Sequence, residues 1–217
     1  METKKYKGII FDIDGTLTST NELIFATFNY IAQKYEGKTY SDEEIIAMFG
    51  PTEDVILKEK FNGDKFIEVY DEYYRYYREN HPRMADLYPG IVDILNELKE
   101  RKILTSIFTG KGRKTTEITL EILGIKNYFD MIVTGDDVIN HKPSPEGILK
   151  FIQTFNLNKD QVLMVGDSVA DIIAARDASI DIASVVWDSY AKDEVIKLNP
   201  LHFETVPDFR NWLMERI

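Results

Sequence analysis

Short apolar segments alternate with helical patterns through the second half of the chain, and this alternation constrains the fold more than any other feature. The expected strands cover residues 103–109, 131–134, 162–165 and 180–187, and amphipathic helical patterns separate them. Strands that alternate with helices form right-handed βαβ units. The second half of the chain therefore predicts a parallel sheet with helices on both faces.

An earlier apolar run, residues 9–11, predicts one more strand of this sheet. Residues 17–84 show helical spacing and no convincing strand, and Ser41 and Glu44 have the form of a helix capping box. We therefore predict an α/β protein, in which a Rossmann-like parallel-sheet core is interrupted by an all-helical cap domain. The core would comprise residues 1–16 and 86–217, and the cap residues 17–85.

The first expected strand ends in two aspartates, Asp12 and Asp14, and Gly15 then allows the backbone to turn. Two carboxylates at a strand end repel each other and are costly to desolvate. A hard cation such as Mg²⁺ relieves both costs, because it prefers oxygen ligands. An Asp-rich turn that caps the next element is the alternative, and the isolated motif leaves both interpretations open.

The amino-acid composition limits which partners and which chemistry we expect for this protein. The 217 residues carry a net charge of −11 and contain no cysteine. An acidic surface repels nucleic acid and anionic membranes, so we expect neither as a partner. The absence of cysteine excludes disulfides and a cysteine nucleophile and suits a reducing compartment. With no long apolar segment in the sequence, we expect a cytoplasmic protein, either a monomer or a homodimer.

Polar residues follow each of the later strands, where ligands bind in open parallel sheets. Thr109 and Gly110 end the second strand, Lys142 follows the third, and the fourth is followed by a polar group, namely Asp167, Ser168 and Asp171. Each has an ordinary alternative: a helix start, a solvated lysine or a helix cap. Their arrival at successive strand ends favours one shared site over several coincidences.

These residues resemble the motifs of the haloacid dehalogenase-like hydrolase superfamily. Asp12 to Thr16 resembles the DxDGT motif, Thr109 the second motif, Lys142 in Lys-Pro-x-Pro the third, and Asp167 the acidic fourth. An insert directly after the first motif resembles a C1 cap, and so does the Tyr88-Pro89-Gly90 return to the core. The resemblance spans the chain from the first strand to the last βα unit.

The resemblance implies a phosphatase chemistry that these side chains can perform. Asp12 would be the nucleophile and Asp14 the general acid and base. Mg²⁺ would be the cofactor. The remaining roles implied are metal binding by Asp12, the Asp14 carbonyl and Asp167, support of the metal by Ser168 and Asp171, phosphoryl binding by Thr109, Gly110 and Lys142, and substrate contact by Lys111.

The expected function is hydrolysis of a small phosphorylated metabolite, as in phosphoglycolate phosphatases. A β-phosphoglucomutase-like mutase and a non-catalytic binding protein of the same fold are the alternatives. Residues 39–55 of the cap contain no Lys or Arg, which argues against a mutase and, more weakly, against bisphosphates or pyrophosphate. Three cap arginines, Arg75, Arg78 and Arg83, leave that question open.

The cap also carries a row of tyrosines at helical spacing, Tyr70, Tyr73, Tyr74 and Tyr77. Such spacing is typical of the buried face of a helix. Stacking against the substrate is the alternative interpretation.

Overall fold

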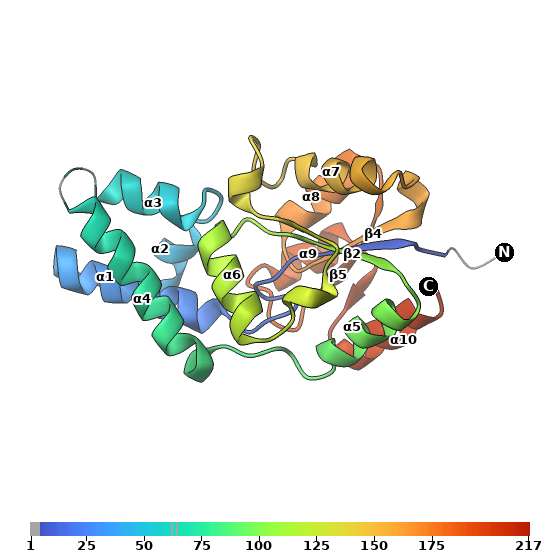
Figure 1. Ribbon diagram of the computed structural model, residues 1–217, viewed down its shortest axis with the longest axis horizontal. Helices are drawn as coiled ribbons and strands as arrows, with labels where there is room; N and C mark the ends of the chain where they lie inside the picture. The colour runs from blue at the N-terminus through green and yellow to red at the C-terminus, as the bar shows by residue number, and fades with distance from the viewer. Residues whose placement is uncertain (1–4, 62, 64) are drawn as a thin grey trace.

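Six parallel strands form the centre of the core (Figure 1). The computed structural model describes residues 5–61, 63 and 65–217. The strand order is β3-β2-β1-β4-β5-β6. The strands are β1 (Gly8–Phe11), β2 (Leu104–Phe108), β3 (Met131–Val133), β4 (Val162–Gly166), β5 (Asp181–Val185) and β6 (His202–Phe203). The predicted parallel sheet is confirmed, but β6 was not predicted because two residues give no periodic signal.

Two layers of helices cover the sheet, and their packing follows the alternation of side chains along β1. Ile9 and Phe11 face one apolar cluster, and Ile10 faces another on the opposite side. The first cluster contains α5 (Ile91–Glu100) and α10 (Val206–Met214), and the second contains α7 (Glu146–Phe155) and α8 (Val169–Ala178). A strand buried on both faces reads as a continuous apolar run, which is what the sequence shows.

The helical insert after β1 forms a cap, seen at the left of Figure 1. Its helices are α1 (Asn21–Glu36), α2 (Asp42–Ile46), α3 (Glu53–Lys60) and α4 (Phe66–Met84). Outgoing and returning chains lie side by side, because Thr18 bridges to Leu87 and the Ser19 N–H donates to the Asp86 carbonyl. The predicted cap boundaries at residues 17 and 85 stay a prediction. Residues 1–4 of the predicted core and residues 62 and 64 of the predicted cap lie outside the described residues.

The tyrosine row forms the interior of the cap. Tyr73, Tyr74 and Tyr77 are buried, and the Tyr73 ring packs edge-on against Phe28 of α1 with ring centres 5.4 Å apart. The predicted capping box at Ser41 and Glu44 is confirmed at the start of α2. The buried-face interpretation therefore holds for three of the four tyrosines, and Tyr70 is partly buried against the same cluster.

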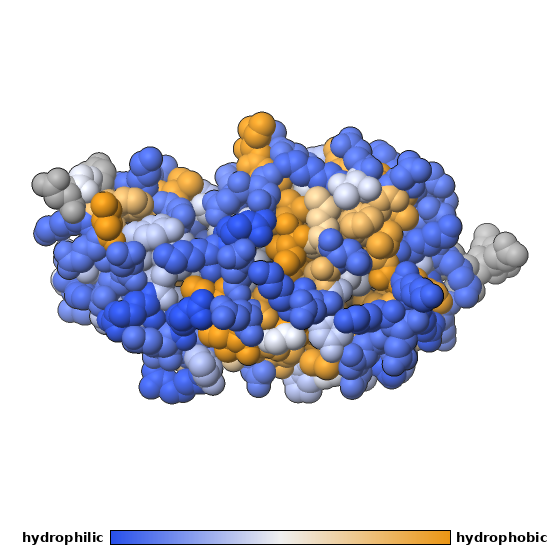
Figure 2. Space-filling view, in the orientation of Figure 1, coloured by the Kyte–Doolittle hydropathy of each residue, from blue (hydrophilic) through white to orange (hydrophobic). Residues whose placement is uncertain are grey.

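One further helix connects the cap with the sheet. In α6 (Arg113–Ile122), Ile118 packs in the cap cluster and Leu120 packs in the core cluster. The remaining elements are α9 (Lys192–Leu198), η1 (Lys126–Tyr128), η2 (Gly135–Asp137) and η3 (Lys159–Gln161). No helix in the described part of the chain is long and apolar enough to cross a membrane. The face in Figure 2 is mostly hydrophilic, with apolar patches toward its centre and over the core.

Close packing of α7 on β2 depends on a glycine, and this gives a test of the fold. A Cβ at Gly147 would overlap the ring of Phe108, which is buried and has no room to move. We expect Gly147→Ala to lower the free energy of unfolding by about 1–3 kcal/mol, measured by urea denaturation. Thr154→Ala, at an exposed position of the same helix, is the control and should change stability by less than about 0.5 kcal/mol. A Gly147→Ala variant as stable as wild type would contradict the packing described.

Candidate active site

The predicted site residues converge at the carboxyl ends of the central strands. Phe11 of β1 pairs with Ile107 of β2 and with Val165 of β4, so the residues that follow these three leave the sheet at one edge. A cavity of about 480 Å³ opens there, between core and cap. Its lining includes eight of the nine predicted site residues: Asp12, Asp14, Thr109, Gly110, Lys111, Lys142, Asp167 and Ser168. The ninth, Asp171, lies directly behind Lys142.

Lys142 is the counter-ion of this cluster. Its ammonium lies 3.0 Å from Asp12 Oδ1 and 2.7 Å from Asp171 Oδ1, and all three side chains are almost fully buried. Burial opposes the charge on Lys142, but the two carboxylates together raise its pKa above the ordinary value. The lysine is therefore charged throughout the physiological range.

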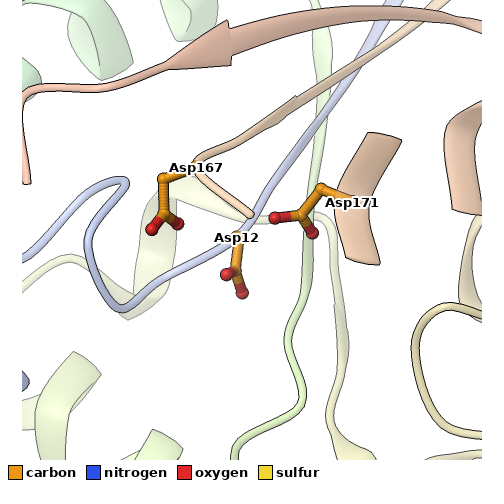
Figure 3. A group of neighbouring side chains, drawn as sticks. All are labelled: Asp12, Asp167 and Asp171. Atoms are coloured by element: carbon orange, nitrogen blue, oxygen red, sulfur yellow. The ribbon is translucent and has the colours of Figure 1, made fainter. Parts of the chain in front are cut away.

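Three carboxylates lie close enough to share one cation. Oxygens of Asp12, Asp167 and Asp171 all fall within 4.8 Å of one another, and Figure 3 shows the three side chains gathered beside the end of β1. Burial first, and then the neighbouring carboxylates, raise the pKa of Asp12 to about 6, against the opposing effect of Lys142. Burial and the same repulsion raise the pKa of Asp167 as well. A divalent cation relieves this crowding.

The hydrogen bonds of the cluster indicate which oxygens could bind a metal. Asp12 Oδ1 is buried and ion-paired to the Lys142 ammonium 3.0 Å away, and it accepts no hydrogen bond. Asp171 is fully committed, because Oδ1 accepts from Lys142 and Oδ2 accepts from the backbone and hydroxyl of Ser168. Asp167 accepts from the Thr16 hydroxyl at 2.9 Å through Oδ1. The residues present thus fit a Mg²⁺ site in which Asp12 and Asp167 supply oxygens and Asp171 holds Lys142 and Ser168.

Gly15 provides the space that this arrangement needs. Its φ of +77° lies in the left-handed region, and a Cβ there would come within 2.6 Å of Asp167 Oδ2. The glycine that follows the two aspartates therefore allows both the turn and the close approach of β4.

Asp14 is not among the three carboxylates that lie within 4.8 Å of one another, and its side chain has other partners. Its Oδ1 accepts a hydrogen bond from Thr20, and the Lys111 ammonium lies 3.2 and 3.3 Å from its two oxygens. Proton transfer by the Asp14 side chain stays a prediction. Metal binding through its backbone carbonyl stays a prediction.

Lys111 lies where the cap meets the core. Only 1% of its side chain is exposed, Glu53 of α3 approaches its ammonium to 3.9 Å, and the Tyr77 ring of α4 lies 4.9 Å away. Burial opposes its charge, but Asp14, Tyr77 and Glu53 raise its pKa above the ordinary value. Lys111 therefore interacts with the core on one side and with the cap on two others.

Glu53 is a residue that the sequence did not single out. From the first turn of α3 it crosses to the core, where it accepts from the Gly112 N–H and the Thr115 hydroxyl, both at 2.7 Å. Gly112 makes room for it, since a Cβ there would lie 2.6 Å from Glu53 Oε2. No local pattern could reveal this contact, because an acid in the first turn of a helix is normally a solvated helix-dipole partner.

The cap supplies mainly apolar side chains to the cavity. They are Ile24, Phe28, Ile46, Phe49 and Ile56. The three cap arginines lie outside the lining: Arg75 pairs with Glu72 and Glu79, Arg78 with Glu121, and Arg83 hydrogen-bonds Asn80.

Comparison with known proteins agrees with this geometry. The family model described as haloacid dehalogenase-like hydrolase matches residues 9–185. A provisionally named pyrophosphatase PpaX of Caldanaerobacter subterraneus is 34% identical over 200 residues, which cover 92% of this chain and 90% of the relative. Pyrophosphatase PpaX of Bacillus cereus is 32% identical, with 82% of each chain covered.

Solved structures give the same fold. A predicted phosphoglycolate phosphatase from Haemophilus somnus superposes with a TM-score of 0.72 at 26% identity, covering 83% of this chain and 84% of the other. A provisionally named β-phosphoglucomutase from Thermotoga maritima gives a TM-score of 0.77 at 25% identity, covering 97% of this chain and 100% of the other.

Removal of the buried counter-ion is a direct test of the carboxylate cluster. We expect Lys142→Met to lower the free energy of unfolding without Mg²⁺ by about 3–5 kcal/mol, because it leaves buried carboxylates uncompensated. Added Mg²⁺ should raise the melting temperature of this variant more than that of wild type. The control is Lys192→Met, which removes an exposed ion pair to Glu204 and should cost less than about 1 kcal/mol. Equal stability of Lys142→Met and wild type would contradict the description of the cluster.

His81, near Lys111, predicts a pH dependence of stability. It is buried with Nδ1 unpaired, and burial, followed by the charge of Lys111, lowers its pKa to about 4. An unfolded histidine has a pKa of about 6.5. Below that pH, His81 is protonated in the unfolded state but stays neutral in the folded state until the pH approaches 4. The contribution of neutral His81 to the free energy of unfolding is therefore complete above the unfolded pKa and is lost as the pH falls toward 4.

The corresponding experiment compares wild type with His81→Leu. Between pH 7 and pH 5 the unfolding free energy of wild type should fall by about 1–2 kcal/mol more than that of the variant. Urea unfolding at both pH values measures the difference. Parallel pH profiles would show that His81 does not contribute.

Proposed function

The chain belongs to the haloacid dehalogenase-like hydrolase family, and on that premise we propose that it is a Mg²⁺-dependent phosphatase that hydrolyses a small phosphorylated metabolite through an aspartyl-phosphate. The observation that carries the proposal is Asp12 in the lining of the cavity, with one buried oxygen that accepts no hydrogen bond and is ion-paired to the Lys142 ammonium 3.0 Å away. Such an oxygen is available as a nucleophile or metal ligand.

The proposed reaction has two steps, and Asp14 transfers a proton in each. An oxygen of Asp12 attacks phosphorus, the bond from phosphorus to the leaving oxygen breaks, and Asp14 donates a proton to that oxygen. Asp14 then removes a proton from the water that attacks the aspartyl-phosphate, which releases inorganic phosphate and restores Asp12. The contacts of Asp14 with Thr20 and Lys111, outside the group of Asp12, Asp167 and Asp171, support this division of roles.

The remaining residues bind the transferring group. Thr109 and the Gly110 amide hold phosphoryl oxygens at the start of the loop to α6, and Lys142 offsets the charge on Asp12 and the phosphoryl group. Mg²⁺, bound by Asp12, Asp167 and the Asp14 carbonyl, would neutralise charge so that two anions can approach each other. Ser168 and Asp171 keep the surrounding side chains in place.

Hydrolysis is favoured over phosphomutase chemistry by the composition of the cap. A mutase holds a second phosphate beneath its cap, which requires positive groups there. Arg75, Arg78 and Arg83 make contacts outside the cavity, and Glu53 is the charged cap residue among the described lining. Pyrophosphate is the second candidate substrate, because the PpaX relatives carry the name of a pyrophosphatase.

Phosphate release from a panel of phosphorylated metabolites, with and without Mg²⁺, tests the proposed activity. The panel includes pyrophosphate and a sugar phosphate with its bisphosphate primer. We expect Mg²⁺-dependent release that falls by about 10³-fold or more in Asp12→Asn, because an amide is not a nucleophile. The control is Asp93→Asn, the same change at an exposed site on α5, which should retain activity.

Three outcomes would contradict the proposal. No phosphate release from any substrate would exclude a phosphatase, and full activity of Asp12→Asn would exclude the aspartyl-phosphate. Isomerisation of the primed sugar phosphate, faster than its hydrolysis, would identify a mutase instead.

A further inference from the structure

We propose that this cavity accepts phosphate esters with an uncharged, apolar leaving group and discriminates against a leaving group that carries a carboxylate or second phosphate. This inference rests on the proposed phosphatase function and adds the class of substrate. It follows from the charge balance of the cavity, from the pairing of its two lysines and from the side chains opposite Asp12.

The charge balance leaves no excess positive charge for a second anion. The charged residues among the described lining are four carboxylates and two lysines, which give the lining a net charge of −2; they are Asp12, Asp14, Glu53, Asp167, Lys111 and Lys142. One bound Mg²⁺ would bring this charge to zero, or to +1 while Asp14 holds the proton that it donates, and the phosphoryl dianion of the substrate would then make the total negative. An anionic leaving group would add more without an available counter-ion.

Both lysines are already committed to protein carboxylates. Lys142 contacts Asp12 and Asp171 at 3.0 and 2.7 Å, and its side chain is 7% exposed. Lys111 contacts Asp14 at 3.2 Å, lies near Glu53 and is 1% exposed. A second anion could recruit either lysine only by leaving a buried carboxylate unpaired, which is costly.

The wall opposite Asp12 favours an apolar body. The cap contributes Ile24, Phe28, Ile46 and Ile56 to it. The lining also includes Phe49 of the cap and Tyr190 of the core, which are 44% and 48% exposed. The Phe25 ring packs near both of them: its centre lies 6.4 Å from the ring centre of Phe49 and 5.4 Å from that of Tyr190. Exposed aromatic rings in a substrate cavity offer contact area to an apolar group and no compensation to an anion.

A matched pair of substrates isolates the charge of the leaving group. Phenyl phosphate and 4-carboxyphenyl phosphate have the same ring and differ in one carboxylate. We expect kcat/KM for phenyl phosphate to exceed that for the carboxylated ester by about tenfold or more, and to exceed that for pyrophosphate as well. Equal or inverted values with active enzyme would overturn this inference and leave the phosphatase proposal intact, whereas inactivity toward every substrate would overturn the phosphatase proposal.

A gain-of-function variant tests the cause. Phe49→Lys adds a free cation to the lining at a half-exposed position and should reduce or invert the preference for phenyl phosphate. Phe49→Gln has no added charge and should reduce activity on both aryl esters without reversing their order. Tyr190→Lys and Tyr190→Gln repeat the test from the core side, in case the cap substitution prevents folding. An unchanged ratio in correctly folded lysine variants would show that charge is not the determinant, and would overturn the inference.

Discussion

The attraction between the Lys142 ammonium and the carboxylates of Asp12 and Asp171 is the interaction on which the site depends. Parallel pairing of β1 with β4 brings Asp12 close to Asp167, and the first turn of α8 adds Asp171 behind them. Three buried carboxylates would not remain together by themselves, since each raises the free energy of the others. The three carboxylates can stay close together because Lys142, from the loop before α7, supplies one positive charge and a metal ion can supply the rest. The same crowding surrounds the Asp12 side chain that we propose as the nucleophile, so the electrostatic strain and the proposed chemistry have one origin.

Much of this arrangement could be predicted from the sequence because topology decides it. A strand that reads as apolar throughout lies within a parallel sheet, and the ends of neighbouring parallel strands meet at one edge. Asp12, Thr109 and Asp167 therefore had to converge once the strands were correctly placed. The short elements α9 and β6 were missed because seven and two residues carry too little periodicity to stand out.

Contacts between the cap and the core could not be predicted, because they depend on how two separately folded parts meet. Glu53 reads locally as a solvated acid at a helix start, yet it is buried and bonded to Gly112 and Thr115. Lys111 lines the cavity, and its contact with the substrate stays a prediction, but its ion pair with Asp14 was not predicted. Through these two residues the cap contacts the side chain that we propose as the acid and base. Movement of the cap would thus change the surroundings of Asp14 as well as the access of water.

The core side of the cavity, its base, and the cap side, its roof, concern different parts of the proposed function. The base carries the residues by which the chain resembles its family, and these are the residues that we propose to transfer the phosphoryl group. The roof comes from the helical insert, and we propose that its apolar side chains select the leaving group. The two PpaX relatives align with 92% and 82% of this chain at 34% and 32% identity, which leaves room for a different roof. Pyrophosphate would place a second phosphate against Ile46, Phe49 and the paired lysines, whereas an uncharged ester would place apolar surface there. Removing an unpaired anion from water costs more free energy than contacts with aliphatic side chains gain. We therefore expect the roof of this chain to favour an uncharged ester over pyrophosphate.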